Sequence, residues 1–294
     1  MKVMVIGSTG QLGADLVAAL PQAGCGTLAV SGRQELDITN TPAFAAFVDQ
    51  HHPDAVINTA AFHNVDLCES QTDSAYQVNT IAVRGLAVEC QKRGILFFQI
   101  GTDYVMDGPV DGKPLPETAP VHPKSIYALT RFGGDCMTLT HAPTVGYVVR
   151  TCGLFGIAGC KLKGGLNFVD TMIAAARAGK PMRVVADQIV APTPTDDLAK
   201  QLILMIQRRP GPGLYHAVSH GQCSWHEFAC AALSLAGIDH PITPVSSGEF
   251  AAPAQRPFYS VLDNQRLRNL GMDIMGDWRE SLRRFIETKY PRHH

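Results

Sequence analysis

The sequence predicts an α/β protein with a doubly wound parallel sheet and a smaller C-terminal lobe. Short apolar runs alternate with longer stretches of helical periodicity, which is typical of βαβ units. The first apolar run leads directly into a glycine-rich turn at the start of the chain. The 294 residues suffice for one large domain with an added lobe.

Five short apolar runs in the first half predict the strands of the sheet. They are Val3–Ile6, Thr27–Val30, Ala55–Asn58, Ile95–Ile100 and Val145–Val149. The stretches between them predict helices beginning near Gln11 and covering 41–50, 72–93 and 126–140. Beyond residue 157 the pattern predicts helices over 167–178, from 195 onwards, over 224–236 and over 277–289, with strands over 182–185 and 214–218. We therefore assign residues 1–156 and 190–221 to the core and residues 157–189 and 222–294 to the smaller lobe.

Composition and charge exclude several classes of protein. The formal net charge of −1 implies no general attraction to nucleic acid or to an anionic membrane. No apolar run approaches the roughly 20 residues that span a bilayer, and the residues before Gly7 are too few for a signal peptide. The eight cysteines, Cys160 among them, form no CxxC pair and lie among apolar residues. We expect reduced core thiols, a cytoplasmic location and no metal site.

The first turn reads Gly7-Ser8-Thr9-Gly10-Gln11-Leu12-Gly13, a GxxGxxG spacing between a strand and a helix. Glycines allow a tight turn and let backbone N–H groups approach a pyrophosphate, which the N-terminus of the following helix also favours. The pattern predicts a Rossmann-like dinucleotide site. The alternative is a purely structural strand–helix turn.

The end of the second strand bears on the choice of cofactor. An acidic residue there would hold a ribose 2′-hydroxyl, whereas arginine suits a 2′-phosphate. The sequence has Arg33 and no acidic residue before Glu35, which favours NADPH over NADH. A solvated Arg33 is the alternative. Asp37-Ile38 follows at a distance suited to the adenine edge.

Three residues predict a catalytic site for the reduction of a carbonyl group. Thr102 ends the fourth strand, Tyr127 begins a helix, and Arg131 lies four residues later on the same helical face. A tyrosine phenol can protonate the alkoxide that forms as hydride arrives, and a nearby cation stabilises the phenolate. Thr102 would hold the carbonyl oxygen.

These motifs resemble those of the extended short-chain dehydrogenase/reductase family, and within it the dTDP-4-dehydrorhamnose reductases. The matching segments run from Gly7–Gly13 and Leu36–Thr39 through Asn58–Phe62, Val65-Asp66, Glu69, Thr102–Val105, Tyr127, Asn167–Val169 and Asp187-Gln188 to Gly213–His216, Ser224-Trp225 and Arg256-Pro257. The resemblance implies that hydride from NADPH or NADH reduces the 4-keto group of a dTDP-linked deoxysugar, the last step towards dTDP-L-rhamnose. It also implies a nucleotide-sugar substrate, and we expect a possible homodimer.

Two positions depart from the family pattern. The YxxxK motif ends in Arg131, which keeps the charge but cannot readily pass a proton. The family commonly carries an aromatic residue where this chain has Gly153, which suggests a wider pocket for the sugar. Both departures favour an alternative, a catalytically weakened cofactor-binding regulatory subunit resembling the β subunit of methionine adenosyltransferase. A sugar epimerase that retains its own NAD is a third alternative.

The expected site residues are as follows. The catalytic residues are Thr102, Tyr127 and Arg131. The cofactor-binding residues are Gly7, Thr9, Gly10, Gln11, Leu12, Gly13, Arg33, Asp37, Ile38, Ala60, Ala61, Tyr127 and Arg131. The substrate-binding residues are Phe62, Val65, Thr102, Asp103, Tyr104, Gly153 and Arg256. Arg256 could equally form an intramolecular salt bridge, His63 and Asn64 could line the pocket or face solvent, and Trp225 and Phe228 are interpreted as core.

Overall fold

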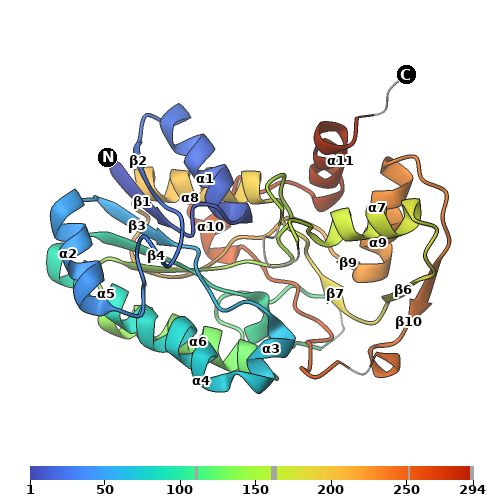
Figure 1. The fold of residues 1–294 in the computed structure, drawn as a ribbon, viewed down its shortest axis with the longest axis horizontal. Helices are drawn as coiled ribbons and strands as arrows, with labels where there is room; N and C mark the ends of the chain where they lie inside the picture. Colours follow the sequence, from blue (N-terminus) through green and yellow to red (C-terminus); the bar gives the residue numbers. More distant parts are fainter. Residues whose placement is uncertain (110–111, 160–163, 251, 292–294) are drawn as a thin grey trace.

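A computed structural model describes residues 1–109, 112–159, 164–250 and 252–291. Its centre is a parallel sheet of six strands in the order β2-β1-β3-β4-β5-β8 (Figure 1). The strands are β1 (Lys2–Ile6), β2 (Gly26–Val30), β3 (Ala55–Asn58), β4 (Leu96–Ile100), β5 (Gly146–Arg150) and β8 (Gly213–His216). The predicted fold class is confirmed, and each predicted strand of the sheet lies within two residues of its observed bounds. The strand order reverses between β1 and β3, where doubly wound sheets bind their ligands.

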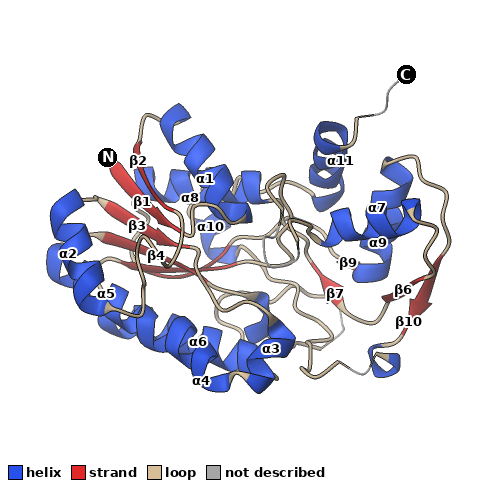
Figure 2. Ribbon diagram, viewed as in Figure 1, coloured by secondary structure: helices blue, strands red, loops and turns tan. Residues whose placement is uncertain are grey.

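Helices cover both faces of the sheet, which Figure 2 shows as red strands between blue helices. On one face pack α1 (Gln11–Gln22), α8 (Thr195–Arg208) and α10 (Gln265–Asn269). On the other lie α2 (Thr41–His51), α5 (Ala82–Arg93) and α6 (Ile126–His141). The strands between them are mostly apolar, as expected for a sheet buried on both sides, with Asn58, Gln99, Arg150 and His216 as buried polar residues near their carboxyl ends.

The helical stretch predicted over 72–93 is interrupted. It begins as α4 (Thr72–Tyr76), widens into the π-helical turn η1 (Gln77–Ile81) and continues as α5. A short helix that the sequence reading did not predict, α3 (Val65–Ser70), precedes it. π turns often mark functional sites, and this one faces α6.

The smaller lobe has a hydrophobic core of its own. It contains α7 (Phe168–Arg177), α9 (Trp225–Leu235) and α11 (Trp278–Lys289), the parallel pair β6 (Met182–Val185) and β10 (Ile242–Val245), and the antiparallel pair β7 (Ile189–Val190) and β9 (Cys223–Ser224). In this core the ring of Phe228 contacts that of Trp278, and the ring of Phe155 contacts those of Phe228 and Phe285. Figure 1 shows the lobe to the right of the sheet.

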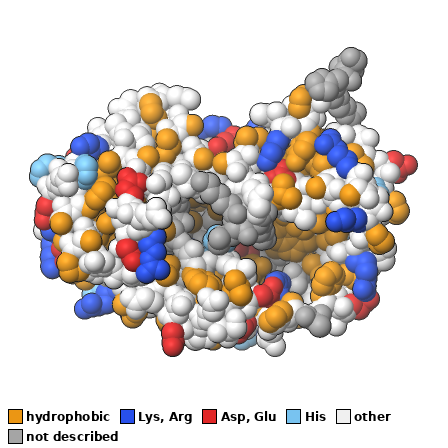
Figure 3. All heavy atoms as spheres, viewed as in Figure 1, with side chains coloured by type: hydrophobic (Ala, Val, Ile, Leu, Met, Phe, Trp, Pro, Cys, Tyr) orange, Lys and Arg blue, Asp and Glu red, His pale blue; other side chains and the backbone are white. Residues whose placement is uncertain are grey.

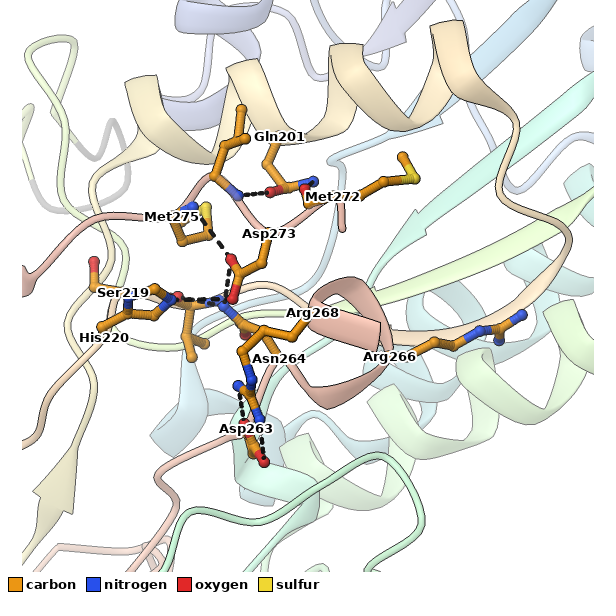
Figure 4. Close-up of polar contacts among 12 residues, drawn as sticks. Gln201, Ser219, His220, Asp263, Asn264, Arg266, Arg268, Met272, Asp273 and Met275 are labelled. Atoms are coloured by element: carbon orange, nitrogen blue, oxygen red, sulfur yellow. Dashed lines mark hydrogen bonds and ion pairs between the residues drawn. The ribbon is translucent and has the colours of Figure 1, made fainter. Parts of the chain in front are cut away.

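Between α9 and α11 the chain returns to the large sheet. Asn264 Nδ2 donates to the Val218 carbonyl at 2.8 Å, and Asn264 Oδ1 accepts the Val218 N–H at 3.0 Å. Figure 4 shows Asn264 beside Asp273, to whose Oδ1 its Nδ2 also donates at 3.3 Å. Gln201 of α8 bonds the backbone on both sides of Asp273. Leu267 belongs to the core beneath the sheet. The division into a core of residues 1–156 and 190–221 and a smaller lobe of residues 157–189 and 222–294 stays a prediction.

Two further expectations concern reduced core thiols and membrane-spanning segments. Five cysteines are buried, whereas Cys136 is half-buried, Cys230 is exposed and Cys160 lies outside the described residues. The described cysteines are free thiols. In the described ranges, no helix has the length and apolarity needed to cross a membrane.

Gly7, directly after β1, has a positive φ of 79° and lies against the loop that follows β3. A Cβ there would stand 2.7 Å from Thr59 Oγ1 and 3.2 Å from the Ala60 nitrogen. Gly24 has a similar φ of 74° and nothing within 4 Å of its Cβ position. We expect Gly24→Ala to lower the free energy of unfolding by about 1–2 kcal/mol from backbone strain, and Gly7→Ala by about 2–4 kcal/mol because a clash is added.

Urea unfolding of both variants measures the difference. Equal losses in the two variants would show that the turn after β1 tolerates a side chain, contrary to this prediction.

Candidate active site

A cavity of about 1450 Å³ lies at the carboxyl ends of the strands, between the sheet and the smaller lobe. Its lining includes residues that follow four strands of the sheet: Gly7 after β1, Thr59 after β3, Gly101 after β4 and Thr151 after β5. Figure 3 shows a hollow in this face of the molecule, with hydrophobic side chains gathered along its right-hand wall. The cavity therefore lies where a sheet of this topology is expected to bind its ligand.

The glycine turn forms one end of this cavity. Gly7, Thr9, Gly10, Gln11 and Leu12 line it, and Gly13 packs beneath. A Cβ at Gly13 would stand 2.2 Å from the Gly7 carbonyl oxygen, so the turn can only be this tight with glycine there.

Helix α1 begins at this turn without a side-chain cap and without an acidic residue in its first turn. Among the described residues, the side-chain oxygen of Gln11 is buried with no hydrogen-bond partner. Free N–H groups, a positive helix end and close backbone approach fit the pyrophosphate of a dinucleotide.

The residues predicted to choose between cofactors lie apart from the cavity lining. Arg33 is 80% exposed and pairs through Nε with Asp37 at 2.7 Å. Hydrogen bonds from Thr39, and then from Arg33, lower the pKa of Asp37. Ile38 is buried in the core. Arg33 therefore has an intramolecular partner in this structure, and its part in choosing NADPH stays a prediction.

The three residues predicted to be catalytic line the cavity together. The side chain of Tyr127 hydrogen-bonds that of Thr102, and its ring meets Tyr104 edge-on with 5.4 Å between centroids. Arg131 is buried, donates through Nη2 to the Ile100 carbonyl at the end of β4, and has an Nε without a partner among the described residues. A phenol, a hydroxyl and a cation thus meet at one point of the wall.

Burial dominates the titration of this cluster. It raises the pKa of Tyr127, while the charge of Arg131 and the hydrogen bond to Thr102 act in the opposite direction. Tyr127 therefore keeps its proton at neutral pH. Burial also raises the pKa of Asp103 to about 6, against hydrogen bonds from Ser260 and Cys152.

Most of the residues predicted to bind substrate line the cavity, but one does not. Val65, Asp103, Tyr104, Gly153 and Arg256 line the cavity, as do Ala60 and Ala61, whereas Phe62 is not among the lining residues. Arg256 forms an ion pair with Asp66 at 2.9 Å and hydrogen-bonds Tyr104. The salt-bridge alternative is therefore realised, on the cavity wall.

The structure also bears on four positions whose interpretation the sequence left open or misjudged. His63 lines the cavity, whereas Asn64 caps α3 by accepting the Leu67 N–H at 3.1 Å. Phe228 is core, as interpreted, but Trp225 is only partly buried and lines the cavity.

The sequence reading missed two residues that hold the site in place. Asn79, in the π turn, accepts the Phe62 N–H at 2.8 Å and donates to the Phe62 carbonyl at 3.0 Å and to Thr130 Oγ1 at 3.1 Å. Glu69 Oε1 of α3 accepts the Ile126 N–H at 2.9 Å, directly before Tyr127. An asparagine amid a helical pattern was the only signal for the first.

No group of three or more His, Cys, Asp or Glu side chains in the described part of the chain could hold a metal ion.

The fold and the cavity define a dinucleotide-binding protein of the extended short-chain dehydrogenase/reductase type. The chain belongs to the RmlD substrate binding domain family, which it matches over residues 1–290.

Relatives agree with this membership. The chain is 36% identical over 289 residues to the spore coat polysaccharide biosynthesis protein SpsK of Bacillus subtilis, covering 98% of each chain. A crystal structure of a dTDP-4-dehydrorhamnose reductase from Clostridium acetobutylicum superposes with a TM-score of 0.91 at 38% identity, covering 98% of this chain and 99% of that one. A dTDP-4-dehydrorhamnose reductase from Bacillus anthracis, solved in complex with NADP, superposes with a TM-score of 0.90 at 33% identity and the same coverage.

Removing the carboxylate of Glu69 tests whether it holds the start of α6. We expect Glu69→Ala to lower the free energy of unfolding by about 1 kcal/mol, because a charged acceptor at a helix N-terminus is lost. Hydrogen exchange of the Ile126 amide should become faster. Ser70→Ala, on the same helix, removes only an exposed hydrogen bond to Leu67 and should change neither quantity. An unchanged Ile126 exchange rate in Glu69→Ala would contradict the prediction.

Asp103 gives a pH-dependent prediction. Because its folded pKa is raised from 3.8 to about 6, the wild type loses stability as pH rises through this window, by about 3 kcal/mol in total. Asp103→Asn cannot titrate, so the stability of the wild type relative to the variant should fall between pH 4 and pH 6 and then level off. Urea unfolding at several pH values measures this, and a constant difference would refute it.

Proposed function

We propose that this protein uses NADPH or NADH to reduce the 4-keto group of a dTDP-linked 6-deoxysugar, in the manner of a dTDP-4-dehydrorhamnose reductase. The observation that carries the proposal is that Thr102, Tyr127 and Arg131 line the same cavity as the glycine turn. The names of the reductases from C. acetobutylicum and B. anthracis support it, and the NADP bound to the latter supports the cofactor.

The reaction divides between the cofactor and three side chains. When bound, NADPH or NADH supplies the hydride that reduces the carbonyl carbon. Tyr127 donates its phenolic proton to the carbonyl oxygen, which becomes the hydroxyl of the product. Thr102 donates a hydrogen bond to the same oxygen. Arg131 offsets the negative charge left on Tyr127.

The remaining site residues bind and orient. The turn from Gly7 to Gly13 receives the pyrophosphate, and Ala60 and Ala61 lie beside the cofactor. Tyr104 packs against Tyr127 and fixes its ring. Val65 and the ion pair of Arg256 with Asp66 lie on the substrate side of the cavity.

The alternatives gain little support. Two of the relatives described above are named reductases, and none is named a regulatory subunit or an epimerase. A cytoplasmic location and a homodimer stay predictions.

The decisive experiment follows NADPH oxidation by purified protein supplied with dTDP-4-keto-6-deoxy sugars. We expect turnover by the wild type and a loss of at least ~100-fold in kcat for Tyr127→Phe, because the proton donor is removed. Tyr76→Phe, an exposed tyrosine on α4, is the matched control and should keep full activity. Arg131→Lys keeps the cation and should stay within about tenfold of the wild type.

Each alternative has its own signature. An epimerase would emerge from purification with its nucleotide bound and would not consume NADPH. A regulatory subunit would bind NADPH without turnover in the wild type and in Arg131→Lys alike. Either result overturns the proposed reductase.

A further inference from the structure

Trp225 stands at a fixed position on the cavity wall. It is the first residue of α9, directly after β9, which pairs with β7. Ser224 Oγ accepts the Glu227 N–H at 3.0 Å, and Glu227 Oε2 accepts the Ser224 N–H at 2.7 Å. This capping box fixes the backbone that carries the indole ring.

The indole takes space that a side chain at residue 153 would otherwise fill. Gly153 has a positive φ of 52°, and a Cβ there would stand 3.2 Å from Trp225 Cη2 and 3.4 Å from the Pro192 Cα. Gly153 lies just beyond β5, whose neighbour β4 ends next to Thr102. Trp225 is therefore the aromatic side chain that faces the cavity beside the end of β5.

The wall around Trp225 is apolar. The ring of Phe168 packs on the indole with 4.8 Å between centroids, and Met172 packs against the core of the smaller lobe. Leu154 and Val185 add further apolar side chains to the lining of the cavity.

The polar side chains of this wall are engaged elsewhere. Asn167 bonds the backbone of Asp170 and of Gly156, and Gln188 donates to Ser247 Oγ at 2.9 Å. Asn167 and Gln188 are therefore occupied, and a methyl group that packs on the indole face gives up no hydrogen bond there.

The sheet side of the same space is polar. Thr102 lines it, and so does Thr151, whose hydroxyl is buried without a partner among the described residues. A sugar lying between these two sides would meet hydroxyl groups on one edge and hydrocarbon on the other. That asymmetry suits a hexose whose C6 carries a methyl group in place of a hydroxymethyl group.

We propose that Trp225, in the space left by Gly153, packs against the C6 methyl group and selects 6-deoxysugars over their 6-hydroxy counterparts. This inference rests on the proposed function, because it requires a dTDP-sugar in the cavity. It assigns Trp225 to substrate discrimination, whereas proton transfer remains with Tyr127.

Two ligands that differ only in the C6 oxygen test the inference. dTDP-6-deoxyglucose and dTDP-glucose are titrated into the protein saturated with NADP⁺, and both dissociation constants are measured by calorimetry. We expect the wild type to favour the 6-deoxy ligand by roughly tenfold or more, as for a methyl group in an apolar pocket. Trp225→Ala should bring the two constants to within about threefold, and Trp225→Phe should keep most of the preference.

Fluorescence supplies an independent measurement, because the chain has two tryptophans and the other, Trp278, is buried in the core of the smaller lobe. In Trp278→Phe the emission comes from Trp225 alone and should change when the 6-deoxy ligand binds. In Trp225→Phe the emission of Trp278 should stay constant. Trp278→Phe is also the matched control in calorimetry and should keep the wild-type preference.

The outcomes separate this inference from the proposed function. If the wild type binds both ligands equally, or if Trp225→Ala binds both with the preference intact, the role of Trp225 is refuted while the reductase proposal stands. The role of Trp225 is also refuted if the fluorescence of Trp278→Phe does not change when the 6-deoxy ligand binds. If the wild type binds neither ligand and reduces no keto sugar, both proposals fall.

Discussion

The turn after β1 passes close to the loop after β3 and folds tightly on itself, so that neither Gly7 nor Gly13 has room for a Cβ. One would meet Thr59 Oγ1 at 2.7 Å and the other the Gly7 carbonyl oxygen at 2.2 Å. This close approach sets the N-terminus of α1 at the same edge of the sheet as the ends of β3 and β4. Because an anion site and a hydroxyl-phenol pair then open into one cavity, a dinucleotide held at one end can reach a carbonyl group at the other.

The short helix α3 ties the two sides of that cavity together. Its Asp66 accepts from Arg256 and from the Ala254 N–H, both on the segment that follows the smaller lobe's β10. Its Glu69 accepts the Ile126 N–H at the start of the helix that carries Tyr127. The ion pair with Arg256 is partly exposed and contributes little to stability by itself. Its consequence is positional, because the same short helix holds Arg256 on one wall of the cavity and the backbone directly before Tyr127 on the other.

The sequence predicted the features that local periodicity determines. It did not predict the features that depend on contacts between residues far apart in the chain. The strands, the glycine turn and the spacing of Tyr127 and Arg131 follow from patterns of a few residues. By contrast, the π turn exists where Asn79 binds the loop around Phe62, 17 residues away. Trp225 could not be distinguished from core, because it packs against core residues and its place in the cavity lining follows only from the tertiary structure. Arg33 was predicted to bind a 2′-phosphate, but in the structure it forms an ion pair with Asp37, four residues later.

The departure at Arg131 matters less for reduction than its sequence suggests. In the proposed reduction the first proton comes from Tyr127 itself, and burial raises the pKa of that phenol, so the proton is present at neutral pH. What the cation must do is stabilise the phenolate left behind, and a guanidinium held by the Ile100 carbonyl does this as a lysine ammonium would. Its inability to pass a proton affects only how Tyr127 is reprotonated afterwards. A slower resupply lowers the turnover rate, but it leaves the hydride and proton delivery to the carbonyl intact.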